Sequence, residues 1–136
     1  MAYDIEKTDE QWRAELSADR YAVLRQAATE PPFTGSLLNV NENGTYTCGG
    51  CGQVLFNSAQ KFESHCGWPS FDACLPGTII ERVDKSLFRR RTEILCSQCG
   101  GHLGHVFNDG PMPTGLRYCV NSLAIDFDGT EKGSAR

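Results

Sequence analysis

The stretches Cys48-Gly49-Gly50-Cys51-Gly52 and Cys96-Ser97-Gln98-Cys99-Gly100 decide the fold of this chain. Each is a Cys-x-x-Cys-Gly knuckle, in which two thiolates can bind one tetrahedral ion from a tight turn while the glycine lets backbone amides approach sulfur. Four thiolates complete a tetrahedral coordination sphere, whereas catalytic zinc keeps one position open for water. The sequence therefore predicts one structural Zn²⁺ ion per chain, bound by Cys48, Cys51, Cys96 and Cys99.

Two other interpretations of the knuckles are weaker. A single Cys-x-x-Cys can be a redox motif, but neither stretch lies in a βαβ pattern. His102 or His105 could replace one thiolate as a zinc ligand, although four cysteines already suffice. Residues 52–95 separate the knuckles, a longer spacing than in a zinc ribbon. We therefore expect the ion to join two distant hairpins and to clamp the fold.

Length and composition indicate one domain over residues 1–136, with a core at about 8–127 and a flexible tail at 128–136. The net charge of −4 argues against nucleic-acid and anionic membrane partners, and Arg89-Arg90-Arg91 is interpreted as solvated side chains on an exposed strand. No basic leader and no run of about 18 apolar residues is visible. We expect a reducing, cytoplasmic location, where the seven cysteines would be metal ligands or reactive thiols.

Two short helices are expected near the N-terminus. Thr8 and Gln11 match a capping box, which predicts a helix from about Asp9. Ser17 can cap a second helix, which must end before Pro31-Pro32 because proline cannot continue it.

From Leu37 onward the pattern changes to short β-like runs, so the predicted fold is mainly β. The turn signal Glu42-Asn43-Gly44-Thr45 predicts a hairpin between strands at Leu37–Val40 and Thr45–Cys48. Asp84-Lys85-Ser86 predicts a second hairpin turn, and residues 109–115 a loop. The other expected strands are Gln53–Phe56, Thr78–Val83, Leu87–Leu95, His105–Phe107 and Leu116–Phe127.

Cys119 is the most suggestive of the three cysteines outside the knuckles. The period of two along a strand places Arg117, Cys119 and Asn121 on one face. A nearby cation favours the nucleophilic thiolate, and an amide can donate a hydrogen bond to a developing oxyanion. An inert buried thiol explains this pentapeptide equally well, since free cysteine is often buried.

Two further motifs contain chemically useful side chains. His102-Leu103-Gly104-His105 follows the second knuckle, and its histidines can donate protons near neutral pH if they face Cys119. Gly67-Trp68-Pro69-Ser70-Phe71 is a stiff aromatic turn, which serves either core packing or an apolar wall for a small substrate group. Cys66 precedes this turn and is either a second redox thiol or a packed one.

Taken together, these motifs resemble the B-class peptide-methionine (R)-S-oxide reductases, the MsrB family, over about residues 8–127. Several long motifs in the right order are far more specific than any one of them. The stretches concerned are the two knuckles, Pro31-Pro32-Phe33-Thr34-Gly35, Cys66-Gly67-Trp68-Pro69-Ser70-Phe71, His102-Leu103-Gly104-His105-Val106-Phe107 and Arg117-Tyr118-Cys119-Val120-Asn121-Ser122. The resemblance implies a mainly β tent of two antiparallel sheets with short N-terminal helices.

The resemblance also implies a reaction on methionine R-sulfoxide in oxidised proteins, with the free amino acid left open as a substrate. The Cys119 thiolate attacks the sulfoxide sulfur and becomes a sulfenic acid. Cys66 then resolves it as a disulfide, which thioredoxin reduces. Cys74 matches none of the family's motifs and is expected to be a bystander, with a resolving role left open. We expect a monomer.

The remaining site residues are likewise implied by the resemblance. Trp68 packs on the substrate methyl group, and Phe107 also contacts the substrate. His102, His105 and Asn121 surround the sulfoxide oxygen, Arg117 promotes the thiolate, and Asp109 orients this group of residues.

Two rival functions each explain only part of the sequence. A non-enzymatic zinc module that binds a protein would explain the knuckles but leaves the face with Cys119 unused. A thiol reductase for disulfides or peroxides would use Cys119 but would not distinguish sulfoxide epimers.

Overall fold

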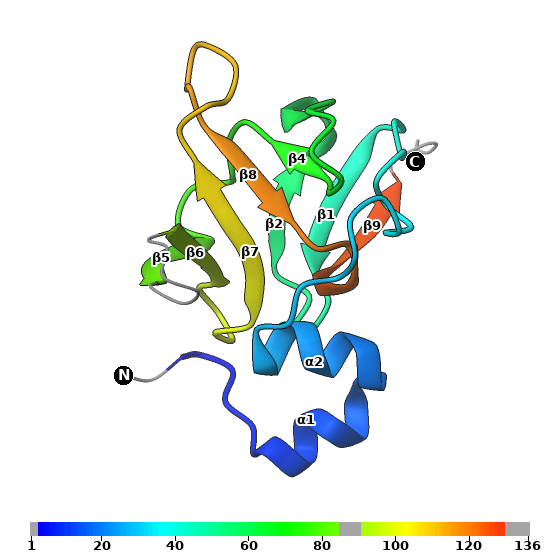
Figure 1. Cartoon of the computed structure of the whole chain (residues 1–136). Coiled ribbons are helices and arrows are strands. Elements are labelled where there is room, and N and C mark those ends of the chain that lie inside the picture. Colours follow the sequence, from blue (N-terminus) through cyan, green and yellow to red (C-terminus); the bar gives the residue numbers. More distant parts are fainter. Residues whose placement is uncertain (1–2, 85–90, 130–136) are drawn as a thin grey trace.

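A computed structural model of the chain describes residues 3–84 and 91–129, and it confirms the mainly β fold with two antiparallel sheets (Figure 1). The smaller sheet has the strand order β2-β1-β9 and the larger β3-β4-β8-β7-β6-β5. The strands are β1 (Gly44–Cys48), β2 (Val54–Asn57), β3 (Lys61–Phe62), β4 (Ser70–Phe71), β5 (Ile79–Asp84), β6 (Arg91–Cys96), β7 (His102–Phe107), β8 (Arg117–Val120) and β9 (Ile125–Gly129).

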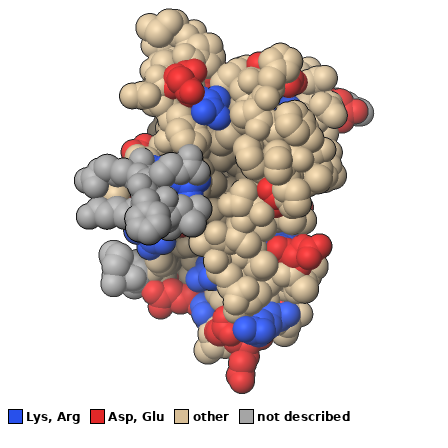
Figure 2. Space-filling model, in the orientation of Figure 1, with Lys and Arg blue, Asp and Glu red and all other residues tan. Residues whose placement is uncertain are grey.

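Both predicted helices are confirmed and lie together at one end of the molecule (Figure 1). Helix α1 (Asp9–Glu15) begins at the capping box of Thr8 and Gln11, and Ser17 caps α2 (Ala18–Gln26). Within the described ranges, no helix has the length and apolar character that crossing a bilayer requires. On the described part of one face, acidic and basic side chains are intermixed rather than gathered in a single basic patch (Figure 2).

The predicted hairpin between Leu37–Val40 and Thr45–Cys48 is wrong. Residues 37–39 form a turn in which the Leu38 N–H donates to the Gly35 carbonyl. Strand β1 pairs instead with β2 and with the distant β9, where Thr45 faces Asp128. Asp128 and Gly129, predicted to begin a frayed tail, belong to β9 instead, and the rest of that predicted tail lies outside the described residues. A turn signal indicates where the chain reverses and does not specify which strand becomes the neighbour.

The single strand predicted at Leu116–Phe127 is two strands in different sheets. The chain leaves β8 at Asn121, forms the 3-10 helix η3 (Ser122–Ala124) and enters the smaller sheet as β9. The strands predicted at Gln53–Phe56 and Thr78–Val83 are confirmed with ends shifted by one residue, whereas β7 begins at His102, three residues before the predicted start. Residues 87–90 of the strand predicted at Leu87–Leu95 lie outside the described residues. Lys85 and Ser86 of the predicted turn also lie outside them.

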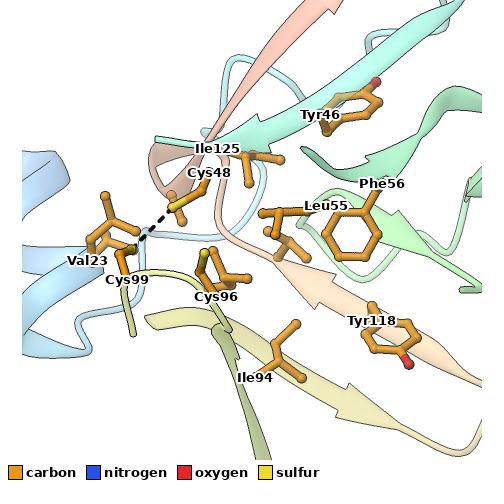
Figure 3. Close-up of a cluster of buried hydrophobic side chains, with 14 of the residues drawn as sticks. Val23, Tyr46, Cys48, Leu55, Phe56, Ile94, Cys96, Cys99, Tyr118 and Ile125 are labelled. Atoms are coloured by element: carbon orange, nitrogen blue, oxygen red, sulfur yellow. Dashed lines mark hydrogen bonds between the residues drawn. The ribbon is translucent and has the colours of Figure 1, made fainter. Parts of the chain in front are cut away.

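The core lies between the two sheets and is rich in aromatic rings. Phe56 of β2 stacks on Phe71 of β4 with ring centroids 4.2 Å apart, and Tyr46 of β1 contacts Phe71 edge-on at 5.0 Å. Tyr118 of β8 meets Phe56 at 5.9 Å. Figure 3 shows Tyr46, Phe56 and Tyr118 from three strands converging on this cluster. These contacts hold β8 against the smaller sheet through one of its two faces.

Candidate active site and metal centre

The two knuckles bring four sulfur atoms together. The first is the turn after β1 and the second is the turn after β6, and all four sulfurs lie within 4.8 Å of one another. Cys48 and Cys99 Sγ are 3.7 Å apart (Figure 3), and Cys51 and Cys96 Sγ are 3.6 Å apart. A tetrahedral ion with Zn–S bonds of about 2.3 Å requires sulfurs about 3.8 Å apart. The four cysteines are therefore positioned to bind a metal ion.

Hydrogen-bond donors around these sulfurs suit a set of thiolate ligands. The Gly50 N–H donates to Cys48 Sγ at 3.3 Å, Gln53 Nε2 to Cys96 Sγ at 3.3 Å, and Gln98 Nε2 to Cys51 Sγ at 3.2 Å. Such donors stabilise negative sulfur and orient it toward an ion. Neither histidine of the His-x-x-His motif belongs to this cluster.

Cys119 lies on strand β8, which is paired on both sides at this residue. Ser70 of β4 is its partner on one side and His105 of β7 on the other. The approach of β7 requires Gly104, since a Cβ there would lie 2.0 Å from the Cys119 carbonyl oxygen. The pairing of β8 with β4 and β7 explains how the motif that contains Ser70 and the motif that contains His105, which are distant in sequence, come to lie on either side of Cys119.

A pocket of about 340 Å³ opens beside Cys119. Alternation along β8 places Arg117 and Cys119 on the pocket side and turns Tyr118 and Val120 into the core. The lining residues are Thr29, Cys66, Trp68, Arg91, Gly104, His105, Phe107, Arg117, Cys119 and Asn121. The pocket thus collects most of the side chains that the sequence motifs single out, from segments far apart in the chain.

The sulfurs of Cys66 and Cys119 are 3.0 Å apart at the pocket wall. Two thiols at this distance share a proton, so the pair loses a first proton easily and a second with difficulty. The hydrogen bond between them lowers the pKa of Cys66 to about 4. The same hydrogen bond, with burial, raises the pKa of Cys119, which the Arg117 guanidinium opposes by donating to its sulfur at 3.1 Å.

Arg117 is held by contacts on two sides. The Arg117 guanidinium donates two hydrogen bonds to the Asp109 carboxylate, at 2.8 and 3.2 Å, and this pairing raises the pKa of Arg117. The guanidinium also lies 4.4 Å from the centre of the Phe107 ring, a cation–π arrangement. Asp109 belongs to the exposed loop after β7 and does not line the pocket, so its connection to Cys119 runs through its hydrogen bonds to Arg117.

The two histidines differ in position. His105 lines the pocket, whereas His102 is buried behind it, with ring centroids 5.6 Å apart. His102 Nδ1 contacts Glu93 Oε2 at 2.6 Å, and burial lowers the pKa of His102. His105 Nε2 contacts Asp84 Oδ2 at 2.9 Å.

Sequence reasoning missed the carboxylates behind both histidines. Glu93 also pairs with Arg82 at 3.0 Å, and Asp84 with Arg91 at 3.3 Å. Arg91 is a partly buried residue of the pocket lining, which corrects its interpretation as a solvated side chain; Arg89 and Arg90 lie outside the described residues. Facing positions of β5 and β6 hold opposite charges in the sequence, a signal that becomes useful only once these strands are paired.

Cys74 lies on the other side of β8. Its sulfur is 3.8 Å from the Tyr118 hydroxyl, and it packs against the hydrophobic core. Since Tyr118 and Cys119 point to opposite faces of the strand, Cys74 has no direct path to the Cys119 sulfur.

The fold and site together have the features of a class of thiol oxidoreductases, in which two adjacent cysteines line a pocket and a separate group of four cysteines is positioned to bind a metal ion. A model of the SelR domain family matches residues 16–129. A peptide methionine sulfoxide reductase MsrB of Leptospira interrogans is 54% identical over 128 residues, which cover 93% of this chain and 98% of that relative.

Two more relatives have the same printed name. The one from Bradyrhizobium diazoefficiens is 55% identical over 90% of this chain and 88% of its own length. The one from Methanosarcina barkeri is 51% identical over 95% of this chain and 92% of its own length. The chain therefore belongs to the MsrB family of peptide methionine sulfoxide reductases, which confirms the resemblance and the enzyme class.

The metal centre predicts a dependence of folding on the ion. We expect purified protein to hold one metal ion per chain and Cys96→Ser to lose it, because three thiolates bind far more weakly than four. Structural zinc contributes about 10–16 kcal/mol in small domains, so the thermal unfolding midpoint should fall with the metal content. Elemental analysis and calorimetry measure both. Cys74→Ser should retain the ion, and a metal-free wild type of full stability would contradict this prediction.

The shared proton predicts a shift in the titration of Cys119. Replacing Cys66 by serine removes the sulfur contact that raises the pKa of Cys119 and leaves the Arg117 contact that lowers it. Alkylation of Cys119 by iodoacetamide, mapped by mass spectrometry across pH, should therefore begin at lower pH in Cys66→Ser than in wild type. Adding Arg117→Gln should reverse the shift, and Cys74→Ser should not change the profile. An unshifted Cys119 profile in Cys66→Ser would rule out proton sharing.

Proposed function

We propose that this chain reduces methionine R-sulfoxide in oxidised proteins to methionine, with Cys119 as nucleophile, Cys66 as resolving thiol and a protein dithiol such as thioredoxin as reductant. One observation supports this proposal above all others. Two sulfurs 3.0 Å apart, one of them in contact with an arginine, lie at the wall of a pocket that also contains an indole, an imidazole and an amide. A non-enzymatic zinc module would have no use for this group.

The reductive step begins when the shared proton moves to Cys66 and leaves Cys119 as the thiolate. Arg117 stabilises this form of Cys119 through its 3.1 Å contact. The thiolate attacks the sulfoxide sulfur and forms a sulfur–sulfur bond while the sulfoxide oxygen takes up one proton. The hydroxyl then passes to the Cys119 sulfur as its bond to the substrate sulfur and the sulfur–sulfur bond both break, and methionine leaves. Cys119 is thereby oxidised to a sulfenic acid while the substrate sulfur is reduced.

Recycling needs the second thiol. The Cys66 sulfur attacks the sulfenic sulfur of Cys119, a disulfide forms, and the oxygen leaves as water. The short distance between the sulfurs means that this step requires little rearrangement. A dithiol protein then reduces the disulfide by thiol–disulfide exchange, which restores both thiols.

The pocket walls support a division of roles around the substrate. Trp68 and Phe107 offer apolar surface for the methyl group and side chain of methionine sulfoxide. His105 lines the pocket and is the favoured proton donor, with Asp84 setting its orientation. His102, which does not line the pocket, would act by packing against His105. Asn121 would hydrogen-bond the sulfoxide oxygen, and Asp109 would orient Arg117.

The metal ion is proposed to be zinc, held by Cys48, Cys51, Cys96 and Cys99. Four thiolates leave no position for water or substrate, so zinc would stabilise the fold and take no part in the reaction. None of these cysteines lines the pocket. We further propose a monomer that works in a reducing compartment such as the cytoplasm, where cysteines serve as metal ligands or thiols rather than as a disulfide framework.

A single-turnover assay with excess enzyme and no reductant tests the proposed function. Wild type should reduce dabsyl-methionine R-sulfoxide and leave the S epimer unchanged. Cys119→Ser should reduce neither, because a serine hydroxyl is a far weaker nucleophile than a thiolate. Cys66→Ser should produce about one methionine per chain and then fail to recycle with thioredoxin.

Cys74→Ser is the matched control and should recycle at the wild-type rate. Equal rates on both epimers, or no reduction of the R epimer by metal-loaded wild type, would refute the proposed function. Comparable activity on a peroxide or a disulfide substrate would instead favour a general thiol reductase.

A further inference from the structure

Glu30 is a buried carboxylate that the proposed mechanism does not use. It is 4% exposed and lies in the connecting segment that follows α2, residues 27–37, just before Pro31-Pro32. Its Oε2 accepts a hydrogen bond from the Ser122 N–H at 2.9 Å, and its Oε1 accepts one from the Leu123 N–H at 3.0 Å. These are the first amides of η3, which have no partner within that helix. The carboxylate therefore fastens the segment to the point where the chain leaves β8.

The backbone of Glu30 contacts two residues of the pocket. Its N–H donates to Asn121 Oδ1 at 2.9 Å, and its carbonyl accepts a hydrogen bond from Trp68 Nε1 at 3.0 Å. Thr29, the preceding residue, itself lines the pocket. The backbone of this one segment thus contacts both the Trp68 indole and the Asn121 side-chain amide, which line different parts of the pocket.

These contacts fix which way the Asn121 amide points. Its Oδ1 accepts from a backbone N–H, which can only donate, and its Nδ2 donates to the Leu103 carbonyl at 3.1 Å, which can only accept. A carboxamide nitrogen has two hydrogens. The second one is the group that Asn121 can offer to the pocket, where it would meet a substrate oxygen as a donor.

Packing shows that the segment is closely fitted to η3. A Cβ on Gly35 would lie 2.1 Å from Ser122 Oγ and 2.5 Å from Glu30 Oε2. The Leu37 N–H also donates to Ser122 Oγ at 3.2 Å. The segment therefore has little room to shift while the carboxylate stays in place.

We propose that Glu30 is a positioning residue for sulfoxide reduction: its carboxylate holds the segment that aims the Trp68 indole and the donor N–H of Asn121 at the substrate. The proposal rests on the function proposed above. It goes further by naming a residue outside the pocket lining that sets the geometry of both walls. Arg117 and Cys119 have no contact with Glu30 in the hydrogen bonds described, so the thiolate should not depend on it.

Glu30→Gln tests this proposal because it keeps the size of the side chain. One amide oxygen can still accept from η3, but the NH₂ group then faces a backbone N–H and must turn away. We expect the single-turnover rate on the R epimer to fall by about tenfold to a hundredfold, the size of effect that follows when reacting groups are misplaced. The alkylation profile of Cys119 should stay as in wild type.

The chain has two tryptophans, so indole N–H signals in a ¹H–¹⁵N spectrum report on positioning directly. The Trp68 signal should shift in Glu30→Gln, whereas the signal of Trp12, buried in the core beside α2, should not. Glu10→Gln, at an exposed position of α1, is the matched control and should leave both signals and the rate unchanged. If Glu30→Gln fails to fold, Glu30→Asp takes its place, because it keeps the charge and shortens the side chain.

A Glu30 variant with the wild-type rate and an unshifted Trp68 signal overturns the proposal. So does a variant whose rate, Trp12 signal and Cys119 alkylation all change together, since that pattern means a general loss of structure. If wild type itself fails to reduce the R epimer, the proposed function fails, and the Trp68 signal still decides whether Glu30 positions that residue.

Discussion

The pairing of β8 on both sides is the constraint on which the rest of the site depends. Tyr118 is paired with Phe71 and Val106, and Cys119 with Ser70 and His105. Because successive side chains alternate, this register turns Tyr118 into the aromatic core and Cys119 into the pocket. A slip of one residue would exchange them and bury the thiol. The core that stabilises the fold and the Cys119 sulfur, the proposed nucleophile, therefore depend on the same hydrogen bonds.

The four knuckle cysteines bring the two sheets together at a second place, and a metal ion bound there would hold the sheets to each other. One knuckle ends β1 of the smaller sheet and the other joins β6 to β7 of the larger one. Leu24 of α2 lies near Gly50 of the first knuckle and near Gly101, the residue that follows the second knuckle. A modest core with many short strands would gain stability from such an ion, because the free energy of binding the ion would add to the free energy of folding. The pocket can then keep polar and charged groups, such as Arg117 and His105, that would not stabilise a core.

Local signals in the sequence were enough for some of this structure. The capping box at Thr8, the Cys-x-x-Cys spacing within each knuckle and the shared face of Arg117 and Cys119 each depend on neighbours a few residues away. The partner of β1 could not be predicted, because β9 comes from the far end of the chain. The break at Asn121 was also missed, since a stretch of strand-like composition does not reveal where the chain changes sheets. Glu30, Asp84 and Glu93 become meaningful only when the strands and segments they contact are assembled in space.

Disulfide mapping decides whether Cys66 and Cys119 form one redox pair at one face of β8. Wild-type protein is incubated with one equivalent of methionine R-sulfoxide and no reductant, the remaining thiols are alkylated, and the peptides are sequenced by mass spectrometry. The account predicts a single new link between Cys66 and Cys119, with Cys74 alkylated. A link from Cys119 to Cys74, or a lasting sulfenic acid on Cys119 with Cys66 alkylated, would contradict it.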